Sequence, residues 1–530
     1  MKKRVLFLLL FIATLSLFIN SYKKWAIPPC FNADEAAFGY NAYSILTTSK
    51  DEYGNLLPLR FKSFGDYKMP LYSYLSVHFI KIFGLNENST RMLNSWLSFF
   101  FPIIIFFFAD ELWRKSSISL ITSFLISVSL GLHTVGRQAH EAYLAAFLIC
   151  LTTLFFVKAI KKTSFKYYII FCLLFLVSLF AYQANRIFFI FYLITIVIYY
   201  LKNKQRVNIS SIILLVVVFL TFSLTDIIYK PERVKNLLFI NDLGFKLKIK
   251  ELATEGGIRL LNNALLVGFK DVAFRYLRYF SPQFLVTTGD ENFRFGYPDM
   301  SLLTTIEYIF IFIGMYFLFK NKEKWRFFII GIFLISPIPA ALTWTDMSLT
   351  RSFFMLIPAL LISSYGYISL FVNIRKNHLL LNLISISFCF FFLYGWNFYL
   401  FHYPKRAITI KAWQCGNKEM ADYVNKNYQK YDKFFITKKN GQPYIFLLFY
   451  LKFSPLRYKQ QARLSPPDEY GFGQVESFDK FTFNFKIPNN GKKVALIGYP
   501  DDFQFSRINY NDTEKIRFKD QEIFGAYGIN

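Results

Sequence analysis

The chain opens with MKKRVLFLLLFIATLSLFI, residues 1–19, in which three basic residues precede an apolar run from Val5 to Ile19. Similar apolar runs recur as far as residue 396. Of the 530 residues, 54% are hydrophobic and 18% are charged, whereas a soluble domain carries about 25% charged residues. This composition excludes a cytosolic enzyme, a disordered chain and a disulfide-stapled secreted domain. The sequence therefore predicts an all-α polytopic membrane protein.

The charged loops predict the topology. No small-residue cleavage site follows the first apolar run, so we expect an uncleaved span with a cytoplasmic N-terminus. Ten further spans are expected near residues 91–109, 117–136, 141–157, 167–183, 187–201, 209–225, 302–319, 327–343, 352–370 and 379–396.

The apolar segment from Leu71 to Gly84 tests this count, because it is short for a crossing of ~20 residues. If it lies at the outer interface, the five Lys/Arg clusters within 114–115, 158–166, 202–206, 320–326 and 375–376 all fall on the cytoplasmic side, as the positive-inside rule requires. We therefore expect about eleven transmembrane helices and an extracytoplasmic C-terminus.

The expected organisation is a membrane domain followed by a small outer domain. The membrane domain covers residues 1–399 and carries two large outer loops, 21–90 and 226–301. Residues 400–530 form an extracytoplasmic α/β domain, with a helix at Asn417–Tyr431 and strands at Asp432–Lys438 and Val494–Gly498.

The net charge and the cysteine spacing indicate which kinds of partner and bond to expect. The formal net charge of +27 is explained by cytoplasmic loops facing anionic lipid, so the lipid bilayer is the expected partner. No basic stripe with interleaved aromatic residues points to nucleic acid. The five cysteines show no CxxC or metal-like spacing, and three lie in apolar runs, so no disulfide can be argued.

Ionisable residues near the outer membrane surface are the candidates for chemistry, because such groups are costly there unless they are used. Asp34-Glu35 opens a stretch with helical spacing. A structural alternative is that Asp34 caps the helix. Lys68 would sit at head-group depth, suited to a lipid-linked phosphate. Its structural alternative is a pair with Asp66.

The outer ends of later spans add further candidates, each with a structural alternative. Arg137 and Glu141 are four residues apart and could form a stabilising pair on one helix face. His140 could be a base or ligand, or a structural residue at a helix start. Arg186 and Arg351 could snorkel to the interface.

Carboxylates and cations together at the outer leaflet suit glycosyl transfer from a polyprenyl-phosphate sugar. The acceptor hydroxyl loses a proton to a carboxylate base while the anomeric carbon is attacked. Arg and Lys stabilise the phosphate that leaves. The lipid tail of the donor explains why such a site is built on membrane spans.

A family resemblance rests on four segments of the outer loops. They are DEAAFGYNA at Asp34–Ala42, KDEYGNLLPL at Lys50–Leu59, YKMP at Tyr67–Pro70 and GRQAHE at Gly136–Glu141. With the acidic pair after the first span and the long first outer loop, they resemble the GT-C glycosyltransferases. The nearest families are the protein O-mannosyltransferases and the lipid A aminoarabinose transferase. The likeness covers residues 1–370 and is strongest in the first 150.

The resemblance implies an activity and a set of site residues. The activity is transfer of a monosaccharide from a polyprenyl-phosphate carrier to a hydroxyl of a glycolipid, cell-envelope glycan or protein, outside the plasma membrane, with inversion. The implied catalytic residues are Asp34 as base, Glu141, and Glu35 ranked below them. Implied phosphate ligands are Lys68, Arg137, Arg186 and Arg351, and implied substrate contacts are Tyr40, Asp66, Tyr67 and His140.

Two departures and two rival functions accompany this hypothesis. No carbohydrate-binding module is inserted in the loop 226–301, which weakens the case for a protein acceptor. For the divalent metal that some members bind, no ligand set is evident beyond His140 and Glu141, so no cofactor is assigned. A lipid-linked oligosaccharide polymerase or ligase would instead use Arg275 and Arg278. A transporter or flippase would show matched helix breaks in two halves, which are not evident.

Overall fold

The computed structural model describes residues 2–64, 66–202, 216–217, 220, 222–224, 238–374, 377–466, 475–486, 493–504, 506 and 508–529. The chain forms two compact units, each assembled from separated stretches of sequence. Unit 1 holds Met1–Lys24, Asn94–Lys230 and Val234–Tyr403, and unit 2 holds mainly Trp25–Leu93 and Pro404–Asn530. The first outer loop thus groups with the C-terminal segment, whereas the linear order of the chain suggests a boundary near residue 400.

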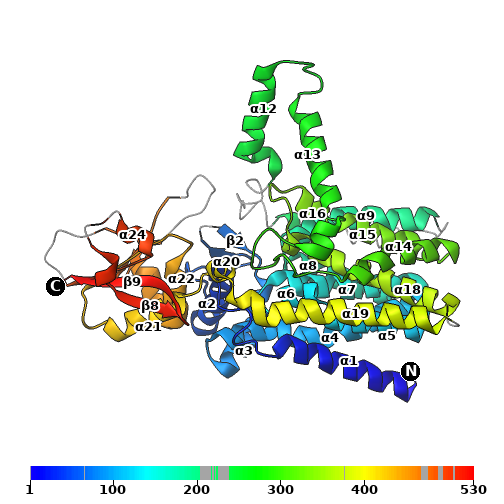
Figure 1. Cartoon of the computed structure of the whole chain (residues 1–530), viewed down its shortest axis with the longest axis horizontal. Helices are drawn as coiled ribbons and strands as arrows, with labels where there is room; N and C mark the ends of the chain where they lie inside the picture. The colour runs from blue at the N-terminus through cyan, green and yellow to red at the C-terminus, as the bar shows by residue number, and fades with distance from the viewer. Residues whose placement is uncertain are drawn as a thin grey trace. The chain divides into compact units, whose positions relative to one another are not determined.

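Unit 1 is built of helices (Figure 1). Their bounds are α1 (Lys3–Ser21), α5 (Ser116–Val128), α6 (Leu130–Gly136), α7 (Glu141–Lys162), α8 (Phe165–Leu179), α9 (Ala184–Lys202), α12 (Leu243–Glu255), α13 (Ala264–Arg278), α14 (Thr305–Lys320), α15 (Arg326–Ile335), α16 (Ile338–Ala341), α17 (Leu349–Ser352), α18 (Leu356–Ile374) and α19 (His378–Asn397). Helix α4 (Glu87–Trp113) begins in unit 2 and continues into unit 1.

The multi-pass membrane character is confirmed. In the described part of the chain, six helical segments are long and apolar enough to cross a membrane, and α5 with α6 would make a seventh span bent by 53°. The shorter apolar helices α8 and α15–α16, and the apolar α14, coincide with further expected spans. The expected span at 209–225 lies largely outside the described residues. The separate segment expected at Leu71–Gly84 is helix α3 (Leu71–Phe83).

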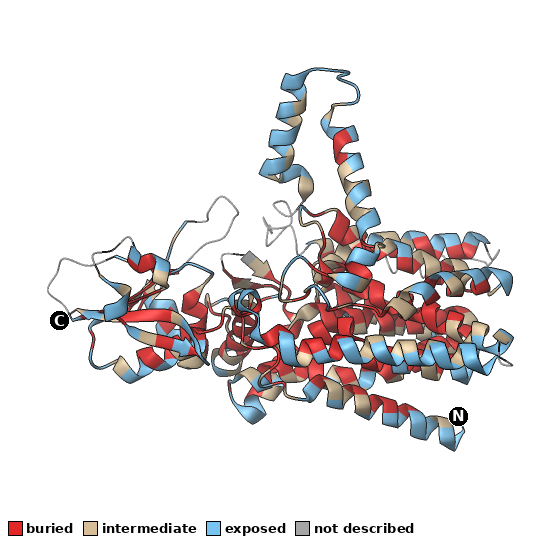
Figure 2. Ribbon diagram, viewed as in Figure 1, coloured by how far each residue is buried: buried red, intermediate tan, exposed pale blue. Residues whose placement is uncertain are grey.

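Small residues let the helices of unit 1 approach closely. A Cβ atom at Gly314 of α14 would come within 2.0 Å of the Ile362 carbonyl oxygen of α18, and one at Gly366 of α18 would meet the Gly314 nitrogen at 2.6 Å. Glycines at such contacts are typical of membrane helix pairs, which gain stability from close packing. Buried residues gather between the long helices, as Figure 2 shows.

Unit 2 combines helices of the first outer loop with a C-terminal α/β sheet. Its helices are α2 (Ala33–Thr48), α3, α20 (Ala407–Ala412), α21 (Asn417–Asn427), α22 (Pro443–Tyr450), α23 (Pro455–Gln461) and α24 (Pro500–Gln504). A short hairpin joins β1 (Phe61–Ser63) to β2 (Asp66–Lys68). The seven-stranded sheet has the order β4 (Arg463–Leu464), β5 (Val475–Phe478), β6 (Phe481–Thr482), β3 (Lys433–Ile436), β7 (Val494–Gly498), β9 (Gln521–Ile529), β8 (Glu514–Phe518).

The central strands of this sheet are buried on both faces. Along β3, Phe434 and Ile436 enter the larger core, while Phe435 between them enters a smaller core with Leu496. This alternation follows from the two-residue period of a strand. The expected helix near 417–431 and the strands near 432–438 and 494–498 are confirmed as α21, β3 and β7.

Helix α2 joins this α/β core through direct packing on α22. A Cβ atom at Gly39 of α2 would come within 2.6 Å of the Phe449 ring of α22, so only glycine permits this approach. The Phe31 ring lies 4.8 Å from the Phe449 ring, and the Tyr40 hydroxyl donates to the Phe453 carbonyl at 2.9 Å. The first outer loop is therefore part of the C-terminal core.

A disulfide bond links the first outer loop covalently to the C-terminal segment. Cys30, just before α2, is bonded to Cys415, 385 residues later in the chain. The spacing of the cysteines did not predict this bond, because nothing in it indicates that the two segments meet. Cys150, Cys172 and Cys389 are free thiols.

We expect Cys30→Ser to lower the free energy of unfolding by about 2–4 kcal/mol, because a disulfide restricts the unfolded chain. Chemical denaturation of the purified protein measures this difference. Cys389→Ser, which removes a free thiol, is the matched control and should leave stability unchanged. Equal stability of the two variants would contradict a structural role for the bond.

Candidate functional site

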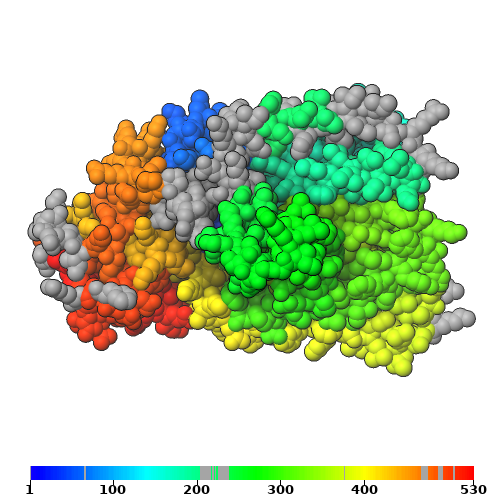
Figure 3. All heavy atoms as spheres, turned by 90° about the horizontal axis from the view of Figure 1, so that it is seen from above, coloured from blue at the N-terminus to red at the C-terminus, as the bar shows by residue number. Residues whose placement is uncertain are grey.

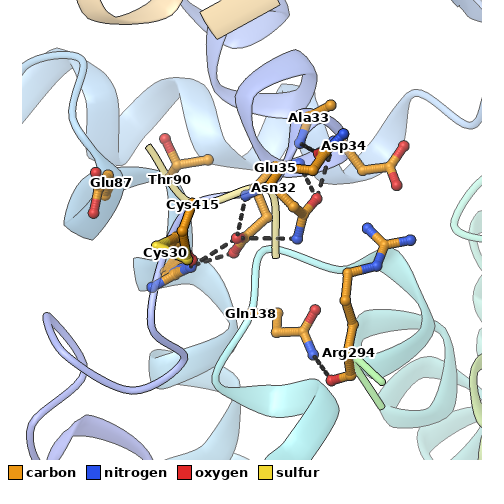
Figure 4. Close-up of polar contacts among 12 residues, drawn as sticks. Cys30, Asn32, Ala33, Asp34, Glu35, Glu87, Thr90, Gln138, Arg294 and Cys415 are labelled. Atoms are coloured by element: carbon orange, nitrogen blue, oxygen red, sulfur yellow. Dashed lines mark hydrogen bonds and ion pairs between the residues drawn. A yellow bond between two sulfur atoms is a disulfide. The ribbon is translucent and has the colours of Figure 1, made fainter. Parts of the chain in front are cut away.

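The start of α2 is held by a capping box. The Asn32 side chain accepts hydrogen bonds from the backbone N–H groups of Asp34 at 3.0 Å and Glu35 at 3.1 Å (Figure 4). The Glu35 carboxylate in turn accepts from the Asn32 backbone N–H at 3.3 Å. Both interactions satisfy N–H groups that a helix start leaves without partners. The cap is therefore Asn32 rather than Asp34, and the Asp34 side chain serves another contact.

Asp34 pairs with Lys68. The Lys68 Nζ donates to Asp34 Oδ1 at 2.8 Å, and it lies 4.4 Å from the Phe64 ring centroid and 5.1 Å from that of Phe38. The Lys68 side chain is 8% exposed, whereas the Asp34 side chain is 41% exposed. The pair thus presents an accessible carboxylate beside a buried ammonium group. Asp66 belongs to β2, but its side chain lies outside the described part, so the expected Asp66–Lys68 pair is not described.

Glu35 has the opposite environment. Its carboxylate accepts from Arg91 Nε and from the terminal guanidinium nitrogen, both at 2.7 Å, and both side chains are 1% exposed. Arg91 also donates to the Cys30 carbonyl at 2.6 Å. The pair is a bidentate, charge-assisted interaction, the strong form of such contacts. It therefore holds the start of α2 next to Cys30.

Glu52 forms a second buried polar centre that the sequence analysis missed. Its carboxylate accepts from Asn41 Nδ2 at 3.3 Å, from the Ser63 hydroxyl at 3.2 Å and from the Tyr444 hydroxyl at 3.1 Å. Its backbone N–H donates to Asn41 Oδ1 at 3.1 Å. Burial, with a smaller contribution from the neighbouring Asp51, raises the pKa of Glu52 to about 8.

The contacts of Glu52 connect the two elements that carry the Asp34–Lys68 pair. Asn41 lies on α2 with Asp34, and Ser63 lies on β1, which pairs with β2 so that Phe61 is opposite Lys68. Glu52 therefore sets the position of the hairpin on α2. The sequence offered one signal for Glu52: it lies inside Lys50–Leu59, one of the four segments on which the family resemblance rests.

The candidates at the start of α7 in unit 1 have structural contacts. Arg137 is fully buried and donates to the carbonyls of Ile19 and Tyr22, both at 2.5 Å, so it holds the end of α1. It ends α6, whereas Glu141 begins α7, so the two residues do not share the face of one helix. The ring of His140 accepts from the Ala142 N–H at 3.1 Å as the cap of α7.

Arg351 lines a cleft of unit 1. Its guanidinium donates to the hydroxyls of Thr343 at 2.9 Å and Thr345 at 2.7 Å. The cleft is lined by Arg351, Tyr182, Asn185, Ser336, Thr350 and apolar residues that include Ala142, directly after Glu141. The Tyr182 ring also lies 6.1 Å from that of His140. The structure thus groups Arg351 with the start of α7. Arg186 stacks on Phe222 at 5.0 Å.

Two further candidates lie in unit 2. Tyr40 is fully buried, and its hydroxyl contacts the chain inside the core, as described above. Tyr67 is half-buried in β2, opposite Lys62. Among the residues that the structure describes, no group of three or more His, Cys, Asp or Glu side chains is arranged to hold a metal ion.

Comparison with known proteins shows a partial family match and a shared fold. Residues 67–229 match the model of the dolichyl-phosphate-mannose-protein mannosyltransferase family. No curated protein matches the sequence. Structures of ArnT from Cupriavidus metallidurans share the fold: the apo state at a TM-score of 0.56 and 11% identity over 98% of this chain and 97% of that one. The form bound to undecaprenyl phosphate matches at 0.55 and 10%, over 99% and 98%.

The chain therefore has the fold of the GT-C glycosyltransferase superfamily, and the resemblance stated from the sequence is confirmed. The oligosaccharyltransferase of Archaeoglobus fulgidus, tethered to an acceptor peptide, also matches, at a TM-score of 0.49 and 12% identity. That match covers 85% of this chain and 63% of the archaeal chain.

We expect Glu35→Gln to lower the free energy of unfolding by about 3–5 kcal/mol, because it leaves the buried Arg91 charge without its counter-ion. Denaturant titration of the purified protein measures the loss. The control is Glu522→Gln, which breaks the exposed pair with Arg517 in the same unit. It should cost less than about 1 kcal/mol. Similar losses in both variants would contradict the role assigned to the buried pair.

The raised pKa of Glu52 predicts a pH dependence of stability. Because the folded-state pKa of about 8 exceeds the usual 4.5, the contribution of Glu52 to stability is complete below pH 4.5 and is lost as pH rises through 8. Glu52→Gln keeps a neutral hydrogen-bonding group, so it should not share this loss. The measurement compares the unfolding free energies of wild type and variant between pH 5 and about 9. A constant difference would contradict the prediction.

Proposed function

We propose that the protein transfers a monosaccharide from a polyprenyl-phosphate carrier to an acceptor hydroxyl, with Asp34 as the base. The observation that carries this proposal is the Asp34–Lys68 pair, in which an accessible carboxylate lies 2.8 Å from a buried ammonium group. General-base catalysis needs the first group, and departure of a phosphate needs the second. The ArnT structure with undecaprenyl phosphate supports a lipid-phosphate ligand for this fold.

In the proposed reaction, Asp34 takes the proton of the acceptor hydroxyl as its oxygen bonds to the anomeric carbon. The bond from that carbon to the phosphate oxygen breaks, and the electron pair leaves with the polyprenyl phosphate. Lys68 stabilises the charge on that oxygen. When the donor phosphate binds Lys68, it partly neutralises the ammonium charge, which then stabilises the Asp34 carboxylate less. The Asp34 carboxylate is therefore a stronger base in the donor complex.

The remaining candidates have supporting roles in this proposal. Glu141 is the second acidic residue, Arg351 and Arg186 are further phosphate ligands, and His140, Tyr67 and Asp66 are substrate contacts, all from the family resemblance. Glu35, Arg137 and Tyr40 make the internal contacts described above, so we assign them positioning roles.

The proposed location of the site is the extracytoplasmic face of the plasma membrane, with the N-terminus in the cytoplasm. The Cys30–Cys415 disulfide of unit 2 supports this side, because disulfides persist in oxidising compartments and are rare in the cytosol. The acceptor is a hydroxyl of a glycolipid, cell-envelope glycan or protein that reaches that face.

We expect Asp34→Asn to reduce transfer by about 10²–10⁴-fold, the usual contribution of a general base. The assay follows release of free polyprenyl phosphate from labelled polyprenyl-phosphate sugars by protein in lipid vesicles, with membrane extract as acceptor. Asp520→Asn, at an exposed turn of the same unit, is the control and should retain activity. Full activity of a folded Asp34→Asn variant would exclude Asp34 as base, and no release by folded wild type would exclude the reaction.

A further inference from the structure

Helices α12 and α13 form a hairpin that stands apart from the bundle of unit 1. In Figure 1 the hairpin runs across the direction of the long helices, and Figure 3 shows it end on, as a raised green knob. Figure 2 shows that most of its surface is exposed. No residue of α12 is buried, and in α13 only Val267 and Gly268 are. Most of the hairpin is thus exposed.

The exposed surface of the hairpin is strongly apolar. Ten large apolar side chains between residues 243 and 278 are 38–77% exposed: Leu243, Leu247, Ile258, Leu260, Leu261, Leu265, Leu266, Phe269, Phe274 and Leu277. A soluble surface rarely carries so much contiguous apolar area without a partner.

The exposed side chains of α13 include an apolar stripe. Leu266, Phe269, Ala273 and Leu277 recur at intervals of three, four and four residues, which places them on one helix face, with Leu265 at its edge. The opposite side of α13 carries Gly268, where a Cβ atom would lie 3.0 Å from Phe239 and 3.4 Å from Phe245 of α12. The stripe therefore points away from the contact between the two helices.

The base of the hairpin is fixed to the ends of membrane spans. The Tyr276 hydroxyl donates to the Leu334 carbonyl at 3.0 Å, in the last turn of α15. Arg278 forms an ion pair with Asp346, and the Phe239 N–H donates to the Leu342 carbonyl at 3.2 Å. Leu342 and Asp346 follow α16, so these two contacts place the base of the hairpin at the end of the expected span that α15 and α16 form, which is the membrane–water interface for a spanning segment.

The charge of the hairpin matches that interface. Residues 243–278 carry seven basic side chains (Lys246, Lys248, Lys250, Arg259, Lys270, Arg275 and Arg278) against three acidic ones (Glu251, Glu255 and Asp271). Basic residues next to an apolar face are typical of helices that lie on anionic lipid. At the base, Arg275 stacks on Phe239 at 5.0 Å, so this arginine and Arg278 make structural contacts.

We propose that the α12–α13 hairpin lies in the outer leaflet of the membrane that holds the protein. Its apolar stripe inserts among the acyl chains, and its basic side chains contact the lipid phosphates. The hairpin thus gives unit 1 a further contact with the bilayer, in addition to its membrane-spanning helices. This inference is independent of the proposed reaction.

Spin labelling of the full-length protein in phosphatidylcholine–phosphatidylglycerol vesicles tests this proposal. A label is attached at Leu265→Cys or Phe269→Cys in a Cys389→Ser background. The exposed thiol Cys389 of α19 is the reference for lipid, and Asp520→Cys is the reference for water. The other free thiols, Cys150 and Cys172, are buried, and Cys30 and Cys415 are bonded.

The expected result is that labels at 265 and 269 relax more with dissolved oxygen than with a water-soluble nickel chelate, as Cys389 does. Relaxation by the nickel chelate to the level of Asp520→Cys would place the stripe in water and overturn the proposal. Protection from both reagents would mean that protein covers the stripe, a second copy or another chain, and would also overturn it. Because both positions are exposed, the substitutions leave the packing of the hairpin intact.

Discussion

The buried ion pair between Glu35 and Arg91 is the interaction on which the candidate site depends. Two opposite charges that are both 1% exposed are stable only if each satisfies the other, so the pair permits one geometry for the start of α2. The disulfide at Cys30, whose carbonyl accepts from Arg91, fixes the same point to the segment around Cys415. Asp34 is the residue next to this anchor. Because Glu35 faces inward, the adjacent Asp34 side chain is accessible and contacts Lys68.

Unit 2 shows how a site can be supported by residues that are distant in sequence. Glu52 connects α2, β1 and α22 through Asn41, Ser63 and Tyr444, and Gly39 lets α2 rest on Phe449. The C-terminal segment is therefore a structural support of the first outer loop. In the proposed reaction this support matters, because a base and a phosphate ligand must be held at a defined separation to act together.

Unit 1 meets a different constraint. In hydrocarbon, each backbone polar group must be satisfied within the protein, so helices are the form that its spans take. Close glycine contacts such as Gly314 with α18 supply the packing that the hydrophobic effect does not supply between helices in lipid. The surface of the α12–α13 hairpin is likewise suited to a lipid environment. Its exposed leucines and phenylalanines are unfavourable in water and favourable among acyl chains.

The sequence by itself determined the membrane class, most of the spans, the elements α21, β3 and β7, and the GT-C resemblance. These features depend on local composition and on short motifs, which can be read along the chain. Only the tertiary structure decided that Asn32 and not Asp34 caps α2, that Glu35 pairs with Arg91, that Cys30 bonds Cys415 and that Arg137 holds α1. Each of these contacts joins groups whose meeting depends on how the elements pack. One sequence without a packing geometry does not specify which of several polar partners a buried side chain will reach.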